Sequence, residues 1–215
     1  MSPSGLRMAL ALVGAVVSWQ VLADDGNAYV GIAAGLSGTT LARADVEAAM
    51  AGAGLSGLTS LDDSDMGIKL YAGIAVSRFL ALEAGYTDFG RFRFHANRTS
   101  AGGGTFFGGD AVTRSVDLSA RAGIPLGGAF SLFGRAGLAM SQTKVSTTTT
   151  RVGGPVSTSE HESTVSPLAG LGAAWRMASH VSLRLEAERH FDIDDGKALG
   201  KQDVDLYSLA VQYHF

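Results

Sequence analysis

The sequence has no cysteine, and it has no apolar run long enough to cross a membrane as a helix. The absence of cysteine excludes a disulfide framework and any thiolate metal site. A spanning helix needs about 20 consecutive apolar residues, and no segment of the chain supplies them. If the protein lies in a membrane, it must cross as a closed barrel, because only helices and closed barrels satisfy their backbone polar groups in lipid.

Charge is scarce and nearly balanced. There are 17 basic and 20 acidic residues, for a net charge of −3, and this balance excludes the strongly basic surface of a nucleic-acid-binding protein. The sequence also has no phosphate-binding glycine loop and no convincing Ser/His/Asp set, so we expect no enzyme activity and no cofactor. Glycine is abundant instead, at 29 residues without a collagen-like period, which is typical of tight turns and closely spaced strands.

The first residues have the features of a secretory signal. Arg7 precedes an apolar stretch over residues 8–17, and residues 21–23 end on Ala23 in a small-residue cleavage pattern. We therefore predict a signal peptide over residues 1–23, cleaved near Ala23, and a single domain over residues 24–215. The alternative, an N-terminal membrane anchor, is disfavoured because the apolar stretch is too short.

The end of the chain alternates strictly between apolar and small or polar residues. The apolar positions of residues 207–215 are Tyr207, Leu209, Val211, Tyr213 and Phe215. A period of two predicts a strand with one oily and one wet face. An amphipathic strand that closes the chain on an aromatic residue is typical of outer-membrane barrels, whose aromatic residues lie at the membrane interfaces.

The same alternation recurs along the whole chain and predicts eight strands. We place them at residues 28–38, 66–76, 79–88, 110–124, 129–142, 164–177, 181–191 and 207–215. Short turns alternate with long polar loops, which we expect over residues 38–65, 89–109, 143–163 and 192–203, with a helical turn at 44–50. This layout predicts an all-β fold, an eight-stranded antiparallel up-and-down transmembrane β-barrel. A soluble barrel with its apolar face inward is disfavoured, since its charged residues would then all face water.

The alternation assigns the charged strand residues to the barrel interior. These are Lys69, Glu83, Asp117, Arg121, Arg135, Arg184, Glu186 and Glu188, four basic and four acidic. The interior of an eight-stranded barrel is just wide enough for side chains to fill, and charges with little water must pair. The balanced set predicts a packed ion-pair network. The alternative is a narrow conduit that opens when the pairs exchange partners.

Several strand motifs resemble the OmpA-like transmembrane domain family. They are Gly67-Ile68-Lys69, Leu82-Glu83-Ala84-Gly85-Tyr86, the run from Leu118 to Pro125, the run from Ser166 to Gly172, Leu183-Arg184-Leu185-Glu186 and the terminal Gln212-Tyr213-His214-Phe215. The resemblance implies an eight-stranded barrel in the outer membrane of a Gram-negative bacterium. It also implies insertion by the barrel assembly machinery, which recognises an assembly signal at Tyr213 and Phe215.

The resemblance extends to the interior, with one departure. The family pairs interior carboxylates with basic residues, and Glu83, Arg121 and Arg184 stand at matching positions. Ala174 occupies the place of a further expected carboxylate. A direct copy of the family's gating network is therefore not expected, and neither is the peptidoglycan-binding domain that some members of the family carry.

Three functions follow as hypotheses. The first is a structural barrel that supports envelope integrity, with at most a narrow, low conductance. The second is a surface adhesin or binding module that acts through its long loops, since loops on rigid scaffolds carry recognition. The third and weakest is a lipid-modifying enzyme using His180 and Ser182. The expected partners are outer-membrane lipid and lipopolysaccharide, the assembly machinery and host or cell-surface ligands, with no nucleic acid.

We expect no metal site. His161, Glu162 and His190 lack a second ligand at a suitable spacing. Residues 192–196 are similar to a calcium loop but lack its closing glutamate, so at most a loose divalent-ion contact is expected there.

Overall fold

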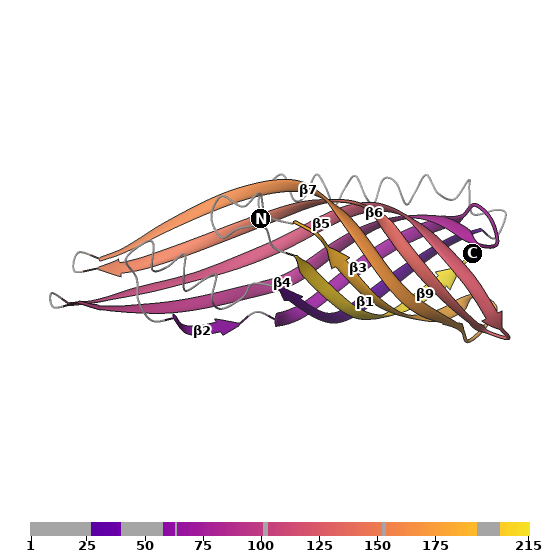
Figure 1. The fold of residues 1–215 in the computed structure, drawn as a ribbon, viewed down its shortest axis with the longest axis horizontal. Helices are drawn as coiled ribbons and strands as arrows, with labels where there is room; N and C mark the ends of the chain where they lie inside the picture. The colour runs from indigo at the N-terminus through magenta and orange to yellow at the C-terminus, as the bar shows by residue number, and fades with distance from the viewer. Residues whose placement is uncertain (1–26, 40–57, 63, 101–102, 152–153, 193–202) are drawn as a thin grey trace.

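The computed structural model describes residues 27–39, 58–62, 64–100, 103–151, 154–192 and 203–215. All regular structure in these ranges is β-strand (Figure 1). The strands are β1 Ala28–Thr39, β2 Leu58–Asp62, β3 Ser64–Ala75, β4 Leu80–Ser100, β5 Gly103–Gly127, β6 Phe130–Arg151, β7 Gly154–Arg176, β8 Val181–His190 and β9 Val204–His214. Among the described residues, no helix is long and apolar enough to span a membrane.

Eight of these strands close into an antiparallel barrel. The sheet runs in the order β4-β3-β1-β9-β8-β7-β6-β5, and a further pairing of β4 with β5 completes the ring. The termini of the described barrel meet where β1 pairs with β9, from Tyr29 opposite His214 to Thr39 opposite Val204. The predicted fold class, an eight-stranded antiparallel barrel, is confirmed.

The alternation that predicted the strands also decides which way their side chains point. On β1, Ile32 and Leu36 face outward and are 56% and 67% exposed, whereas Tyr29 and Ala33 face inward and are buried. The same arrangement on the other strands produces an outward band of aliphatic and aromatic residues. On β5 this band runs from Val116 to Ile124, nine residues, close to the 9–11 residues that a tilted strand needs to cross the hydrocarbon core.

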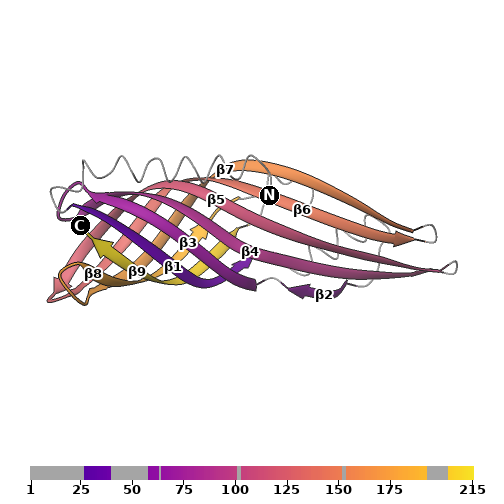
Figure 2. The same ribbon diagram turned by 180° about the vertical axis from the view of Figure 1, so that it is seen from behind.

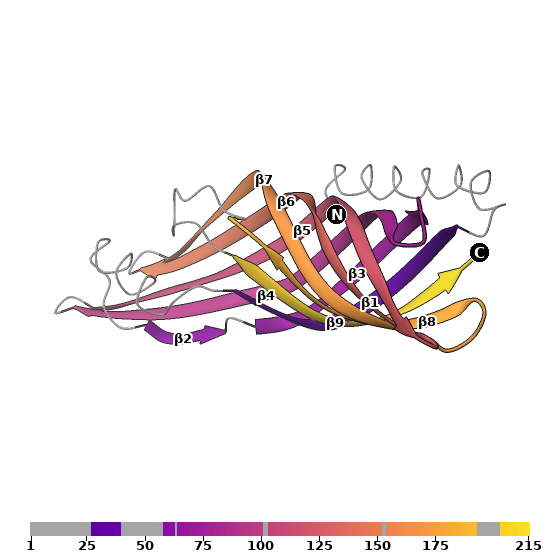
Figure 3. The ribbon, with the colours of Figure 1, turned by 45° about the vertical axis from the view of Figure 1, so that its right-hand side comes forward.

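Two of the long loops predicted from the sequence are wrong. The structure continues β4 and β5 as a paired hairpin through residues 89–109, as far as Ser100 opposite Gly103. It likewise pairs β6 with β7 through residues 143–163, as far as Arg151 opposite Gly154. Strands β4 to β7 therefore extend well past the rest of the barrel (Figures 1 and 3). Apolar residues still alternate at Phe92, Phe94 and Ala96. The rest of these segments is rich in serine, threonine and glycine, so a search for alternating apolar residues did not detect them as strands.

The structure describes part of the predicted loop at 38–65 and little of the predicted loop at 192–203. Within residues 38–65, the short strand β2 pairs with β4, from Leu58 opposite Ala96 to Asp62 opposite Arg93, and it lies beside the extended part of β4 (Figure 2). The helical turn predicted at 44–50 lies outside the described residues. Most of the predicted loop at 192–203 also lies outside them.

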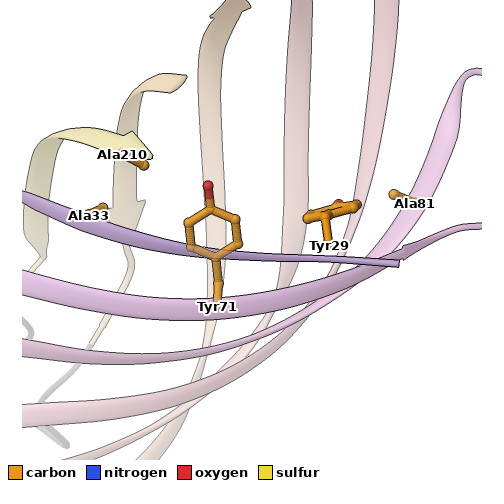
Figure 4. Packing of buried hydrophobic residues seen from close by; sticks show 5 residues of the cluster. All are labelled: Tyr29, Ala33, Tyr71, Ala81 and Ala210. Atoms are coloured by element: carbon orange, nitrogen blue, oxygen red, sulfur yellow. The ribbon is translucent and has the colours of Figure 1, made fainter. Parts of the chain in front are cut away.

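Aromatic side chains are buried in the interior of the half nearer the short turns. Tyr29 and Tyr71 are both buried and point inward from β1 and β3 (Figure 4). Each ring lies over a glycine of the neighbouring strand: a Cβ atom at Gly73 would come within 2.2 Å of Tyr29, and one at Gly31 within 2.3 Å of Tyr71. These two glycines give the tyrosine rings room to lie flat against the wall.

Candidate functional site: the charged lumen

All eight charged residues predicted for the interior point into the barrel. Seven are buried, with exposed fractions of at most 6%, and only Arg121 is partly open, with 19% of its side chain exposed. They come from five strands: Lys69 on β3, Glu83 on β4, Asp117 and Arg121 on β5, Arg135 on β6, and Arg184, Glu186 and Glu188 on β8. The fold therefore gathers residues that lie up to 119 positions apart in the sequence.

Glu83 is the first centre of this network. Its Oε1 lies 2.7 Å from Arg184 Nη1 and its Oε2 lies 3.1 Å from Arg184 Nη2, a bidentate pair across the lumen. Arg121 Nε lies 3.1 Å from Oε1, and Tyr29 donates its hydroxyl hydrogen to the same oxygen at 2.6 Å. A buried carboxylate with this many donors has its charge and its lone pairs satisfied.

Arg135 is the second centre. Its guanidinium pairs with Asp117 and Glu188, and its Nε donates to Ser119 at 2.7 Å. Lys69 of β3 reaches one of these carboxylates as well, with its Nζ 2.5 Å from Glu188.

The two centres are joined into one network. Arg135 Nε lies 3.5 Å from Glu83 Oε2. Glu186 links them a second way, since its Oε1 accepts from Arg184 at 3.0 Å and its Oε2 lies 3.3 Å from Lys69. The four basic and four acidic residues thus pair within a single buried cluster.

The structure explains how the network works without a carboxylate at position 174. Ala174 lies directly opposite Arg184 in the β7–β8 register, where a carboxylate would have been the nearest partner. Glu186, two residues along the same strand as Arg184, supplies that interaction instead.

Several neutral residues take part that the sequence reasoning did not single out. The Arg184 guanidinium stacks over Phe133 and Tyr71, at 4.4 and 4.7 Å from the ring centroids, and Arg121 lies 5.2 Å from the Phe133 ring. Gln212 accepts from the Tyr71 hydroxyl at 3.2 Å. All of these residues occupy inward positions of the alternation, so an inspection of every inward residue, not only the charged ones, would have found them.

A second group of buried side chains lies on the side of the extended hairpins. His190 is fully buried, with its Nε2 2.7 Å from Glu188 and its ring packed edge-on against Phe89. Phe89 clusters with Val204 and Leu206, which are also buried. The charge network therefore lies between tyrosine rings at one end and an apolar cap at the other.

The remaining candidate residues do not form a second site. Ser182 Oγ lies 2.9 Å from His214 Nε2, not against His180, whose Nδ1 instead lies 2.9 Å from the backbone oxygen of His214. Among the described residues, no carboxylate bonds to this pair, and no group of three potential metal ligands occurs. The side chains of His161 and Glu162, and residues 193–196, lie outside what the structure describes. Tyr213 and Phe215 face outward and pack edge to face at 5.3 Å.

Comparisons with known proteins agree with this architecture. Residues 23–215 match the model of the OmpA-like transmembrane domain. Outer membrane protein A of Salmonella typhi is 25% identical over 154 residues, covering 71% of this chain and 41% of that protein. Its counterpart in Klebsiella aerogenes is 23% identical over the whole chain and 56% of that protein. The chain thus spans about half the length of these curated relatives.

A solved structure shows the same fold. The crystal structure of Neisserial surface protein A matches with a TM-score of 0.56 and 14% identity, covering 87% of this chain and 97% of that one. At this identity the match concerns the fold alone.

Proposed function

The chain belongs to the family of OmpA-like transmembrane domains, which are outer-membrane β-barrels, and from that premise we propose that it is a structural barrel supporting the integrity of the envelope. Its lumen is closed at rest and passes solutes poorly. We assign no catalysis to the Ser182–His214 contact, since among the described residues no acid bonds to it and orients the imidazole.

The buried ion-pair network supports this proposal most directly. An open pore keeps its charges in water, whereas here seven of the eight lumen charges are almost completely buried, and the eight charges together balance to zero. Removing charges from water costs several kcal/mol per ion unless they are well paired. Such an interior suits a rigid plug and opposes the passage of ions.

The orientation follows from the same premise. The short turns between β3 and β4, β5 and β6, and β7 and β8 lie at the end where β1 begins and β9 finishes. In outer-membrane barrels this is the periplasmic side, so the extended hairpins face outward. Export through the signal peptide at residues 1–23, and insertion by the assembly machinery through Tyr213 and Phe215, belong to the same proposal.

Envelope integrity is testable in cells. A strain lacking the protein is expected to become sensitive to detergent and to leak a periplasmic marker enzyme. A complementing copy whose β4–β5 and β6–β7 extensions are replaced by two-residue turns is expected to restore resistance, because the lipid-spanning barrel is intact. Full resistance without the protein would overturn the structural role.

A second candidate function is a surface binding module. The observation that favours it is the paired extension of β4 to β7, which projects an ordered sheet beyond the barrel (Figure 1). The variant with shortened β4–β5 and β6–β7 hairpins tests this function too, because it keeps the barrel and removes the proposed binding surface. Loss of adhesion to host cells or to neighbouring bacteria, with detergent resistance retained, would assign binding to the hairpins.

A further inference from the structure

The end of the barrel that carries the short turns has basic side chains but no acidic ones among its described residues. It is formed by residues 27–29, 74–81, 121–133, 174–183 and 210–215, and none of these is aspartate or glutamate. The basic residues and histidines of these ranges are Arg78, Arg121, Arg176, His180 and His214. The positive charge of this end is therefore not balanced within the part of the chain that the structure describes.

Three of these side chains belong to the inward face of the barrel. Arg176 pairs in register with the buried Ser182 and so shares its face of the sheet. The guanidinium of Arg121 lies 5.5 Å from the ring centroid of Tyr29, and the His214 ring lies 5.8 Å from the same ring. We call Tyr29, Arg121, Arg176, Ser182 and His214 the basic mouth.

Arg121 is the least compensated base of the lumen network. The other three bases each contact at least two carboxylates. Arg121 has only Glu83, which already accepts from Arg184 and Tyr29, and its Nε makes no hydrogen bond. Arg176 has no ion-pair partner within the described ranges. The basic mouth thus lacks a carboxylate of its own.

Two carboxylates stand in the sequence immediately before this mouth. Asp24, Asp25 and Gly26 separate the predicted cleavage site from Asn27. Asn27 is fixed at this end of the barrel, since its backbone oxygen accepts from the Ala75 amide at 2.8 Å. Four residues lead from Asp25 to Tyr29, and an extended chain of that length spans about 14 Å. Asp25 can therefore reach the side chains around the Tyr29 ring.

We propose that residues 24–26 fold into the basic mouth and that Asp25 pairs there with Arg121, with Asp24 nearer to Arg176. The inference rests on the proposed function, because cleavage after Ala23 is what frees the segment to turn inward. The alternation of β1 places Asp25 on the same side as Tyr29, and arginine binds carboxylate through charge-assisted hydrogen bonds. The docked segment covers the lumen at this end and gives Arg121 a carboxylate that it does not share.

A pair of thiols measures the docking, in a chain that has no cysteine. Gly26→Cys is combined with Gly123→Cys on the inward face of β5, where an added Cβ meets no atom closer than 3.6 Å. The control pair combines Gly26→Cys with Ile124→Cys, since Ile124 faces outward and is 67% exposed. The first pair is expected to form a disulfide about tenfold faster than the control, because the bond requires Cα atoms within about 7 Å. Equal rates would overturn the proposal.

Neutralising the acid tests whether charge holds the segment in place. Asp25→Asn is expected to slow the cross-link to position 123 about fivefold, the population ratio that a partly exposed ion pair provides. Salt at 1 M is expected to act in the same direction, because the Debye length falls to about 3 Å. Asp110→Asn, at the other end of β5, is the matched control and should leave the rate unchanged. A rate that Asp25→Asn does not alter would refute the pairing.

Modification of Arg121 by phenylglyoxal, read by mass spectrometry, distinguishes the segment from another occupant. Arg121 is expected to react more slowly in the wild-type protein than in Asp25→Asn. If it reacts equally in both proteins and only inorganic phosphate protects it, the mouth is a site for soluble anions and the proposal is wrong.

The intact mass of the protein extracted from outer membranes tests the premise by itself. A chain that begins at Asp24 and forms no cross-link would refute the docking and leave the proposed export standing. A chain that begins at another residue would refute the predicted cleavage site, whatever the cross-linking result.

Discussion

Replacing Glu83 by glutamine is expected to destabilise the barrel by about 3–5 kcal/mol, the typical cost of breaking a buried ion pair by removing one partner. The glutamine keeps the size of the side chain and removes only its charge. Arg184, which is 1% exposed, loses the bidentate partner at 2.7 and 3.1 Å, and Arg121 loses its partner at 3.1 Å. Neither guanidinium can release its proton, so both stay charged and poorly compensated.

An exposed pair in the same protein provides the matched control. Arg189 and Asp205 form an equally well-aligned bidentate pair, but the Arg189 side chain is 44% exposed. Asp205→Asn is therefore expected to cost only about 0–1 kcal/mol. A third variant, Glu83→Gln with Arg184→Met, removes both charges and is expected to be less destabilised than the sum of its single substitutions.

Urea unfolding in phospholipid vesicles measures these differences. Trp175 lies on the lipid-facing surface, stacked on Phe130 at 5.8 Å, so its emission reports the transfer from lipid to water. Heat-modifiable gel mobility reports the folded fraction independently. If Glu83→Gln costs no more than Asp205→Asn, the lumen charges are hydrated and the argument for a closed interior fails.

Three further predictions concern other parts of the barrel. Gly73→Val is expected to slow folding and lower stability, because its Cβ would come within 2.2 Å of the Tyr29 ring; Tyr29→Ala in the same chain should recover part of the loss in urea titrations, and no recovery would place the defect elsewhere. Leu138→Arg, in the apolar band, is expected to cost about 2–4 kcal/mol, against about 0–1 for Gln142→Arg at its edge; equal costs in vesicle unfolding would contradict the assigned membrane depth. Deleting Phe215 is expected to reduce outer-membrane levels of the protein in cells without abolishing refolding into detergent micelles, and normal levels by immunoblotting would contradict an assembly signal at this residue.

The strand count and the face of each strand were predictable because lipid imposes a strict period of two. On β9, for example, the apolar residues Tyr207, Leu209, Val211 and Tyr213 all face outward. Ser208, Ala210 and Gln212, which lie between them, are buried in the interior. The same constraint is absent beyond the membrane. There the extensions of β4 to β7 are rich in serine, threonine and glycine and carry little apolar alternation beyond Phe92, Phe94 and Ala96, so loops were predicted in their place.

The charged members of the lumen cluster were predictable for the same reason, but their pairing was not. Alternation puts Lys69 and Glu188 on the inward face without indicating that they meet, since that depends on barrel closure and on the stagger of the strands. The pairing of Glu186 with Arg184 could not be predicted either, because the strand opposite Arg184 carries Ala174 where a carboxylate was expected. The stacking of Arg184 on Phe133 likewise depends on how the barrel closes, which brings β8 and β6 together.

Single-channel recording in planar bilayers tests the central claim, a lumen closed by paired charges, most directly. With folding verified by heat-modifiable mobility, the wild-type barrel is expected to show no long-lived open state. Glu83→Gln, with the network broken at its first centre, is expected to show brief steps of current. A steady conductance in the wild-type protein that Glu83→Gln leaves unchanged would contradict the account, because ions would then pass through a lumen that the network does not close.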